Sequence, residues 1–172
     1  QWSLMQGDAY WCARSLPDAC FDLIYADPPF FSGRARQVPG GAAFEDRWTG
    51  GMEAYIAWLE PRLEEMRRLL APTGSLFIHL DWHACHAAKM LLDRIFGTRH
   101  FVNEIIWSYR TGGNGRRRLA CKHDTILFYA RGSAYMFHPR RERSDLTHAY
   151  GLANAGVLRD ERVPGTKIKV VT

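Results

Sequence analysis

The sequence contains no long apolar run. Nowhere does it approach the roughly 20 consecutive apolar residues that a membrane-spanning helix requires, so we expect no membrane partner. It also has no signal-peptide pattern, and its start at Gln1 rather than Met suggests a trimmed terminus. Together these absences predict a cytoplasmic protein.

Cysteine is scarce and scattered along the chain. The four residues, Cys12, Cys20, Cys85 and Cys121, include no Cys-x-x-Cys pair. Because a chain of this length and spacing does not match a disulfide framework, we expect reduced thiols.

A glycine-rich strand-to-helix turn of the dinucleotide-binding type is also missing. The segment Gly112-Gly113-Asn114-Gly115 has some of its glycines, but three arginines follow it and no helix is predicted there. We therefore do not assign it to a cofactor.

The composition is that of an ordinary soluble domain. Of 172 residues, 47% are hydrophobic and 24% are charged, which is enough for one compact domain with its own core. The net charge of +5 is compatible with a polyanionic partner but does not establish one.

The apolar pattern alternates strands and helices. The expected strands cover residues 21–25, 75–80, 104–109 and 125–130, the last two antiparallel. The expected helices cover residues 52–70 and 82–96. The first strand is nearly continuously apolar, which favours burial on both faces of a parallel sheet. This order predicts the α/β class, as one half of an open sheet.

Four features are expected to interrupt or end these elements. Residues 32–51 are rich in glycine, proline and charge and predict a mobile loop. Pro61 is expected to kink or split the first helix. Pro72-Thr73-Gly74 predicts a turn before the second strand, and Gly97 predicts the end of the second helix.

The segment Asp22 to Phe30 is the most informative part of the chain. An apolar strand leads to Asp27, and Pro28 and Pro29 then restrict the backbone beside the aromatic ring of Phe30. We expect a rigid turn that presents a carboxylate, carbonyl acceptors and an exposed aromatic face. Such a surface suits a flat ring that carries an amino group.

With Asp27-Pro28-Pro29-Phe30 at the end of a strand, the sequence resembles the permuted, beta-class DNA amino-methyltransferases, including modification subunits of restriction systems. Roughly residues 3–137 share this resemblance. The matching segments, in family order, are Gly7-Asp8, Leu16-Pro17-Asp18, Phe44 to Trp48, the helix from Tyr55 to Leu70, Gly74 to Asp81, Ile95-Phe96-Gly97, Phe101 to Trp107, and Lys122 to Leu127.

The resemblance implies a Rossmann-like sheet that is mostly parallel with an antiparallel hairpin at one edge. It implies methyl transfer from S-adenosyl-L-methionine to the N6 amine of an adenine flipped out of double-stranded DNA. The catalytic residues would be Asp27, Pro28, Pro29 and Phe30. Asp27 and the Pro28 carbonyl would accept the amine hydrogens, and Phe30 would stack on the base.

Other parts of the site follow from the same resemblance. Asp8, Asp27 and Asp81 are the expected cofactor-binding residues, although Asp8 also suits a helix N-cap. The family needs no metal, although His79, Asp81, His83, Cys85 and His86 carry typical metal-ligand groups.

A basic segment is expected to contact DNA phosphates. Its residues are Arg110, Arg116, Arg117, Arg118, Lys122 and His123. The alternative is a solvated charged loop without a DNA contact. A second basic cluster consists of Arg140, Arg141 and Arg143, and for this cluster the two interpretations are equally favoured.

The chain departs from the family in one respect. Relatives carry a Phe-x-Gly-x-Gly-type cofactor loop later in the sequence, and none occurs before Thr172. We therefore expect an incomplete cofactor pocket, with the catalytic part at residues 1–137. Residues 138–172 form an irregular segment in which a target-recognition region could begin.

Several functions stay open at this point. The second reading keeps the fold but changes the substrate to the N4 amine of cytosine, RNA or a glutamine side chain. Cytosine-N4 enzymes usually carry Ser in place of Asp27, and glutamine-modifying relatives carry Asn, so adenine is favoured. A non-catalytic DNA-binding or assembly subunit is the third reading. The expected location is the cytoplasm, in association with the nucleoid. A homodimer or a restriction or specificity subunit is the expected protein partner.

Overall fold

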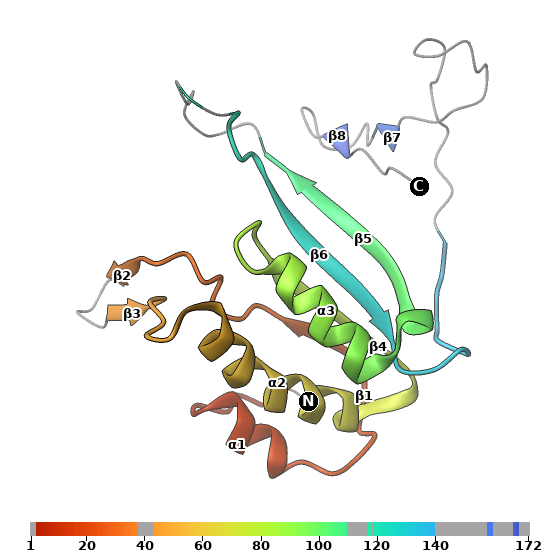
Figure 1. Cartoon of the computed structure of the whole chain (residues 1–172). Coiled ribbons are helices and arrows are strands. Elements are labelled where there is room, and N and C mark those ends of the chain that lie inside the picture. Colours follow the sequence, from red (N-terminus) through yellow and green to blue (C-terminus); the bar gives the residue numbers. More distant parts are fainter. Residues whose placement is uncertain are drawn as a thin grey trace, which may run out of the picture.

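The computed structural model describes residues 3–37, 43–109, 117, 119–139, 158–159 and 167–168. The strands are β1 (Phe21–Ala26), β2 (Ala35–Gln37), β3 (Ala43–Glu45), β4 (Leu70–Leu80), β5 (Phe101–Ser108), β6 (His123–Ala130), β7 (Leu158–Arg159) and β8 (Lys167–Ile168) (Figure 1). The helices are α1 (Ala9–Arg14), α2 (Gly51–Leu69), α3 (Cys85–Phe96) and a 3-10 turn at Thr98–His100.

The central sheet has four strands in the order β1-β4-β6-β5. β1 runs parallel to β4, whereas β4 with β6 and β5 with β6 are antiparallel. The predicted α/β class and the antiparallel hairpin at one edge are thus confirmed. Because β1 and β4 are parallel, the residues that follow them, beginning with Asp27 and Asp81, emerge at the same edge of the sheet.

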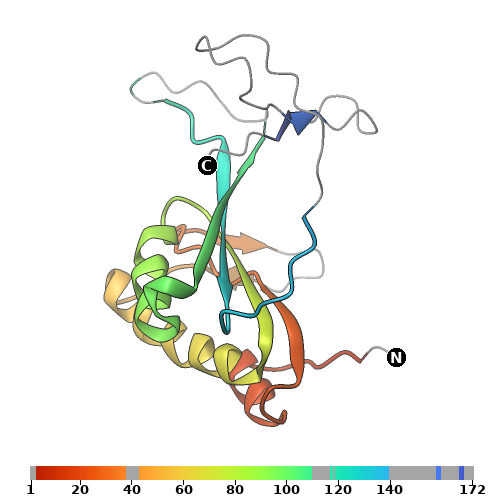
Figure 2. The ribbon, with the colours of Figure 1, turned by 90° about the vertical axis from the view of Figure 1, so that its right-hand side faces the viewer.

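The core lies between the sheet and two helices. Leu76, Ile78 and Leu80 of β4 are fully buried, because every second side chain of the strand points toward the helices. α2 contributes Tyr55, Leu59, Leu63 and Leu69 to this layer, and α3 contributes Cys85, Ala88, Leu91, Leu92 and Phe96. Figure 2 shows both helices on the same side of the sheet.

β1 differs from the expectation in its burial. Phe21, Leu23 and Tyr25 are 39%, 59% and 55% exposed, so the prediction that the strand is buried on both faces is wrong. Only the alternate residues Ile24 and Ala26 face the helical layer. The reason is position: β1 is an edge strand of the sheet, and its other face carries none of the helices that the structure describes.

Pro61 and Pro72 both lie inside regular elements. α2 continues through Pro61 from Gly51 to Leu69, so of the two expected effects of this proline the split of the helix is wrong. Burial of Leu59 and Leu63 on either side of the proline offsets the backbone hydrogen bond that its ring removes. Pro72 lies within β4 rather than in a separate turn, at an irregularity where the register with β1 shifts.

Residues 32–51 contain more structure than a loop. β2 and β3 pair as a short antiparallel hairpin, with residues 38–42 outside the described part. Gly97 ends α3 as predicted, with a φ of +90° that favours glycine. None of the helices described is long and apolar enough to cross a membrane.

Candidate active site

The Asp27-Pro28-Pro29 turn is anchored to α2 by a buried tyrosine. Tyr55 is completely buried, and its hydroxyl donates to the Pro29 carbonyl at 2.8 Å. Burial and the nearby carboxylates of Asp46 and Asp81 raise the pKa of Tyr55, so its hydroxyl stays protonated and remains a donor. The turn therefore rests on a helix of the core, and does not depend on its prolines alone.

A second anchor holds the residues after the turn. Asp46 is only 3% exposed, and its carboxylate accepts from the Phe31 N–H at 2.9 Å and from the Ser32 N–H at 2.7 Å. The Ser32 hydroxyl and the Trp48 indole N–H donate to the same carboxylate at 2.6 and 3.3 Å. Burial would raise the pKa of Asp46, but these hydrogen bonds outweigh it and hold the pKa below its usual value.

Phe31 shows why this second anchor is needed. Its φ of +61° lies in the left-handed region, which is rare for a bulky residue. Such a conformation persists only where the surroundings hold it, and here the Asp46 carboxylate binds the Phe31 N–H directly. The backbone reverses at this point, immediately after Phe30.

Asp27 presents its carboxylate at the end of β1. Its side chain is 59% exposed, and one carboxylate oxygen, Oδ1, lies 3.4 Å from Nδ1 of His79. It is thus positioned by one neighbour and still accessible to a ligand. The predicted catalytic carboxylate lies where ligands bind in open α/β sheets, beyond the carboxyl ends of the strands.

His79 connects two carboxylates across three strands of the sheet. Its Nε2 lies 3.3 Å from Oδ2 of Asp124 in β6, opposite its contact with Asp27. The hydroxyl of Tyr109, just after β5, donates to the other oxygen of Asp124 at 3.4 Å. The sequence reasoning considered His79 only as a metal ligand and missed Asp124. The only signal was that both residues lie in family-like segments.

Phe30 is less exposed than predicted. Its side chain is half-buried and packs against the core cluster, and its ring meets the His79 ring edge to face at a centroid distance of 5.2 Å. The prediction of an exposed ring beside the carboxylate is therefore only partly right. The ring lies next to the Asp27–His79 pair, with part of its surface already in contact with protein.

The two further carboxylates predicted to bind a cofactor already have partners. Asp8 caps α1 by accepting from the Tyr10 N–H at 2.8 Å, and it pairs with Arg62 at 2.6 Å. The Arg62 hydrogen bond holds the pKa of Asp8 below its usual value. Asp81 binds the backbone N–H and Nδ1 of His83 at 2.9 and 2.7 Å.

The basic segment lies partly outside the described residues. Arg110, Arg116 and Arg118 fall outside, as do Arg140, Arg141 and Arg143, whereas Arg117 is described and exposed. Lys122 closes the β5–β6 hairpin, because its carbonyl accepts from the Tyr109 N–H at 3.0 Å. His123 pairs with Ser108 at the first position of β6, next to Asp124. Lys122 and His123 thus lie at the same edge of the sheet as Asp27.

The metal-ligand side chains of the sequence do not converge. His79 and His83 pair with different carboxylates, and Cys85 is buried in the core, where burial raises the pKa of its thiol. Within the described ranges, no three or more His, Cys, Asp or Glu side chains form a group that could hold a metal ion.

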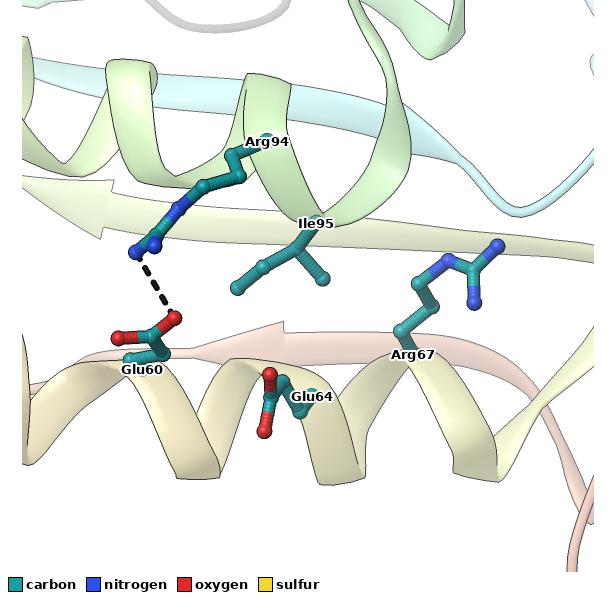
Figure 3. A pocket seen from close by; sticks show the side chains of 5 residues that line it. All are labelled: Glu60, Glu64, Arg67, Arg94 and Ile95. Atoms are coloured by element: carbon teal, nitrogen blue, oxygen red, sulfur yellow. Dashed lines mark ion pairs between the residues drawn. The ribbon is translucent and has the colours of Figure 1, made fainter.

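A hollow of about 410 Å³ lies between α2 and α3, away from this turn. Figure 3 shows its lining, in which Glu60 and Arg94 form an ion pair at 2.8 Å across the two helices. The other lining residues are Glu64, Arg67 and Ile95. It contains none of the predicted site residues.

Known proteins resemble this chain over the segments described above. A Type II methyltransferase of Enterobacter cloacae, M.EcaI, is 31% identical over 129 residues, covering 72% of this chain and 27% of its own length. The Mod subunit of the Type III restriction-modification enzyme EcoP15I of Escherichia coli is 26% identical over 132 residues, which is 63% of this chain and 20% of that subunit. Across the first seven curated relatives, the chain spans 20% to 40% of their length.

Solved structures share the fold. The cytosine-N4-specific PvuII DNA methyltransferase superimposes with a TM-score of 0.53 at 15% identity, covering 75% of this chain and 48% of its own. A proposed DNA modification methylase from Thermus thermophilus superimposes with a TM-score of 0.53 at 21% identity. The match covers 78% of this chain and 54% of that protein. A model of the N6/N4 DNA methylase family matches residues 21–164, which include the Asp27 turn, the His79 strand and the β5–β6 hairpin. The chain belongs to this family of DNA methylases.

Proposed function

We propose that this chain carries the base-binding side of the active site of an S-adenosyl-L-methionine-dependent DNA methyltransferase that modifies the N6 amine of adenine. The observation that carries the proposal is the exposed Asp27 carboxylate at the end of β1, on a turn anchored through Tyr55 and Asp46. Family membership supports the reaction class.

The chemistry follows from the amine. The lone pair of an aromatic amine is delocalised into the ring, so the nitrogen is a poor nucleophile. When Asp27 and the Pro28 carbonyl accept its two hydrogens, the lone pair can localise and point out of the ring plane. Fixed acceptors also stabilise the positive charge that develops on nitrogen during transfer.

S-adenosyl-L-methionine would supply a methyl group on a positively charged sulfonium. Asp27 and Asp81, of the predicted cofactor residues, both follow parallel strands at one edge of the sheet, where ligands bind in open α/β folds. Asp8 is engaged by Arg62 and Asp81 by His83, so a contribution from either would have to include that contact. After transfer the nitrogen is a methylated ammonium, and it loses its proton easily.

Adenine is preferred to cytosine because Asp27 stands where cytosine-N4 enzymes usually carry Ser. The shared fold does not separate the two substrates, since the PvuII enzyme named above is cytosine-N4-specific. Double-stranded DNA would be the substrate partner. The exposed Arg117, together with Lys122 and His123 where the β5–β6 connection joins β6, would contact its phosphates. A restriction subunit is a further proposed partner, since EcoP15I Mod is described as part of a restriction-modification enzyme.

The test is transfer of a labelled methyl group to unmethylated DNA by the natural protein that contains this chain. We expect labelled N6-methyladenine after nucleoside digestion, and we expect Asp27→Ala to lower the rate by at least about 100-fold. Asp22→Ala is the matched control, because Asp22 is an exposed carboxylate in the same strand. Detection of labelled N4-methylcytosine instead would show that cytosine, and not adenine, is the target base. Tight DNA binding without any methyl transfer would favour a non-catalytic subunit.

A further inference from the structure

The position of His79 between two carboxylates has no role in the proposed function so far. Its ring nitrogens lie 3.4 Å from Asp27 and 3.3 Å from Asp124. The side chain is 21% exposed, whereas that of Asp27 is 59% exposed. We propose that His79 is a positioning residue that orients the Asp27 carboxylate toward the target amine and couples it to the β5–β6 hairpin. This inference rests on the proposed function.

The imidazole of His79 lies between the two carboxylates, with one ring nitrogen toward each. Nε2 is within hydrogen-bond distance of Oδ2 of Asp124, and Nδ1 lies 3.4 Å from Oδ1 of Asp27. Because both contacts are made by one rigid ring, a rotation of that ring would change both at once. We call these three side chains the Asp27–His79–Asp124 arrangement.

The contact between His79 and Asp27 would leave one oxygen of the Asp27 carboxylate for the substrate. The contact with His79 engages Oδ1 of Asp27, so Oδ2 is the oxygen that can accept from the amine. Phe30 meets the His79 ring edge to face at 5.2 Å, and Tyr25 lies at a centroid distance of 6.4 Å. These aromatic contacts restrain the imidazole, and through it they restrain the carboxylate.

Asp124, the carboxylate on the other side of His79, lies in the β5–β6 hairpin. Asp124 is the second residue of β6, and it accepts from the hydroxyl of Tyr109 just beyond the end of β5. His123, proposed to contact DNA, directly precedes it in the sequence, and Lys122, also proposed to contact DNA, comes one residue earlier. A shift of the hairpin on DNA binding would move Asp124, and the effect would reach Asp27 through His79.

The charged and titratable groups around His79 are few. Asp27 and Tyr25 face it from β1, Asp124 from β6, and Tyr109 stands behind Asp124. Burial and the charge of Asp27 raise the pKa of Tyr25, and burial and Asp124 raise that of Tyr109, so both stay neutral.

The kinetic test compares variants in the natural protein that contains this chain. We expect His79→Asn to lower kcat by at least about tenfold while KM for DNA and for S-adenosyl-L-methionine changes less than twofold, because a small misplacement of a reacting group costs rate. Asp124→Asn should have a similar effect, and the double variant should be no worse than either one. His86→Asn, an exposed histidine on α3, is the control.

Additive effects of the two substitutions, or a rise in KM as large as the fall in kcat, would overturn the coupling. Inactivity of the parent protein toward DNA would instead count against the proposed function. In that case nitrogen NMR of labelled histidine tests the contacts themselves. The ring nitrogen signals of His79 should shift in Asp27→Asn and in Asp124→Asn, but not in Asp22→Asn. Signals that respond to neither of the first two substitutions would refute the Asp27–His79–Asp124 arrangement.

Discussion

Replacement of Asp46 by asparagine is expected to destabilise the turn that follows Phe30. Asn keeps the size of the side chain, and its carbonyl oxygen can still accept from the Phe31 N–H. Its amide group, however, replaces the oxygen that accepts from the Ser32 N–H at 2.7 Å. Because an amide nitrogen cannot accept, that backbone donor loses its partner in a site that is almost completely buried.

The magnitude follows from these contacts. A buried donor without a partner costs about 1–3 kcal/mol, and hydrogen bonds to a charged group are worth about 1.5–3 kcal/mol each. Loss of the Ser32 bond and weakening of the Phe31 bond therefore predict a decrease of about 2–4 kcal/mol in the free energy of unfolding. The left-handed Phe31 would also lose part of its restraint, so the rate of methyl transfer should fall.

Urea denaturation, followed by circular dichroism, would measure the change in stability. Asp22→Asn is the control, since exposed substitutions usually change stability by less than about 0.5 kcal/mol. If Asp46→Asn were as stable as this control, the assignment of Asp46 as the anchor of the turn would be refuted.

The pH dependence of the parent protein gives an independent check on the same carboxylate. Hydrogen bonds lower the pKa of folded Asp46, despite its burial. Its contribution is therefore present above the unfolded pKa of about 3.9, and it is lost as the pH falls through the lower folded value. Below a pH of about 4 the stability of the parent should drop more steeply than that of Asp46→Asn.

Three further outcomes are expected. Tyr55→Phe removes the hydrogen bond to the Pro29 carbonyl and should cost about 1 kcal/mol in urea denaturation, with a larger proportional loss of transfer rate than of DNA affinity. Lys122→Ala should weaken DNA binding equally for all sequences and reduce the dependence of log affinity on log salt by about one, as measured by fluorescence titration. Ile78→Ala empties a fully buried position in β4 and should lower the free energy of unfolding by about 2–5 kcal/mol; a loss below about 1 kcal/mol would contradict the described core.

The sequence predicted the elements well because their signals are local. The apolar run before Asp27, the helical spacing around Leu59 and the glycine at position 97 each act over a few residues. Pro61 does not split α2, because the packing of this helix against the core compensates for the local cost of the proline. The exposure of β1 also could not be predicted, since an uninterrupted apolar run looks the same whether one face or both are covered.

The contacts of the site were mostly beyond sequence reasoning. Asp46 binds Phe31 across 15 positions, and His79 meets Asp124 across 45. These pairs depend on strand order and register, which place β4 between β1 and β6. Asp27 could be predicted because two prolines mark its role in the sequence, whereas no neighbouring residue marks His79 or Asp124.

We expect the edge position of β1 to make the apparent stability of this chain depend on its concentration. The edge of β1 away from β4 is not paired with any described strand, and an unpaired edge is a template for the addition of another strand. Leu23 and Tyr25, on the uncovered face of the same strand, are each more than half exposed, and full burial of a large apolar side chain is worth about 1.5–3 kcal/mol. Association along this edge would stabilise the folded form by mass action, so thermal midpoints of this chain should rise with protein concentration. Dilute and concentrated samples would thus give different apparent stabilities.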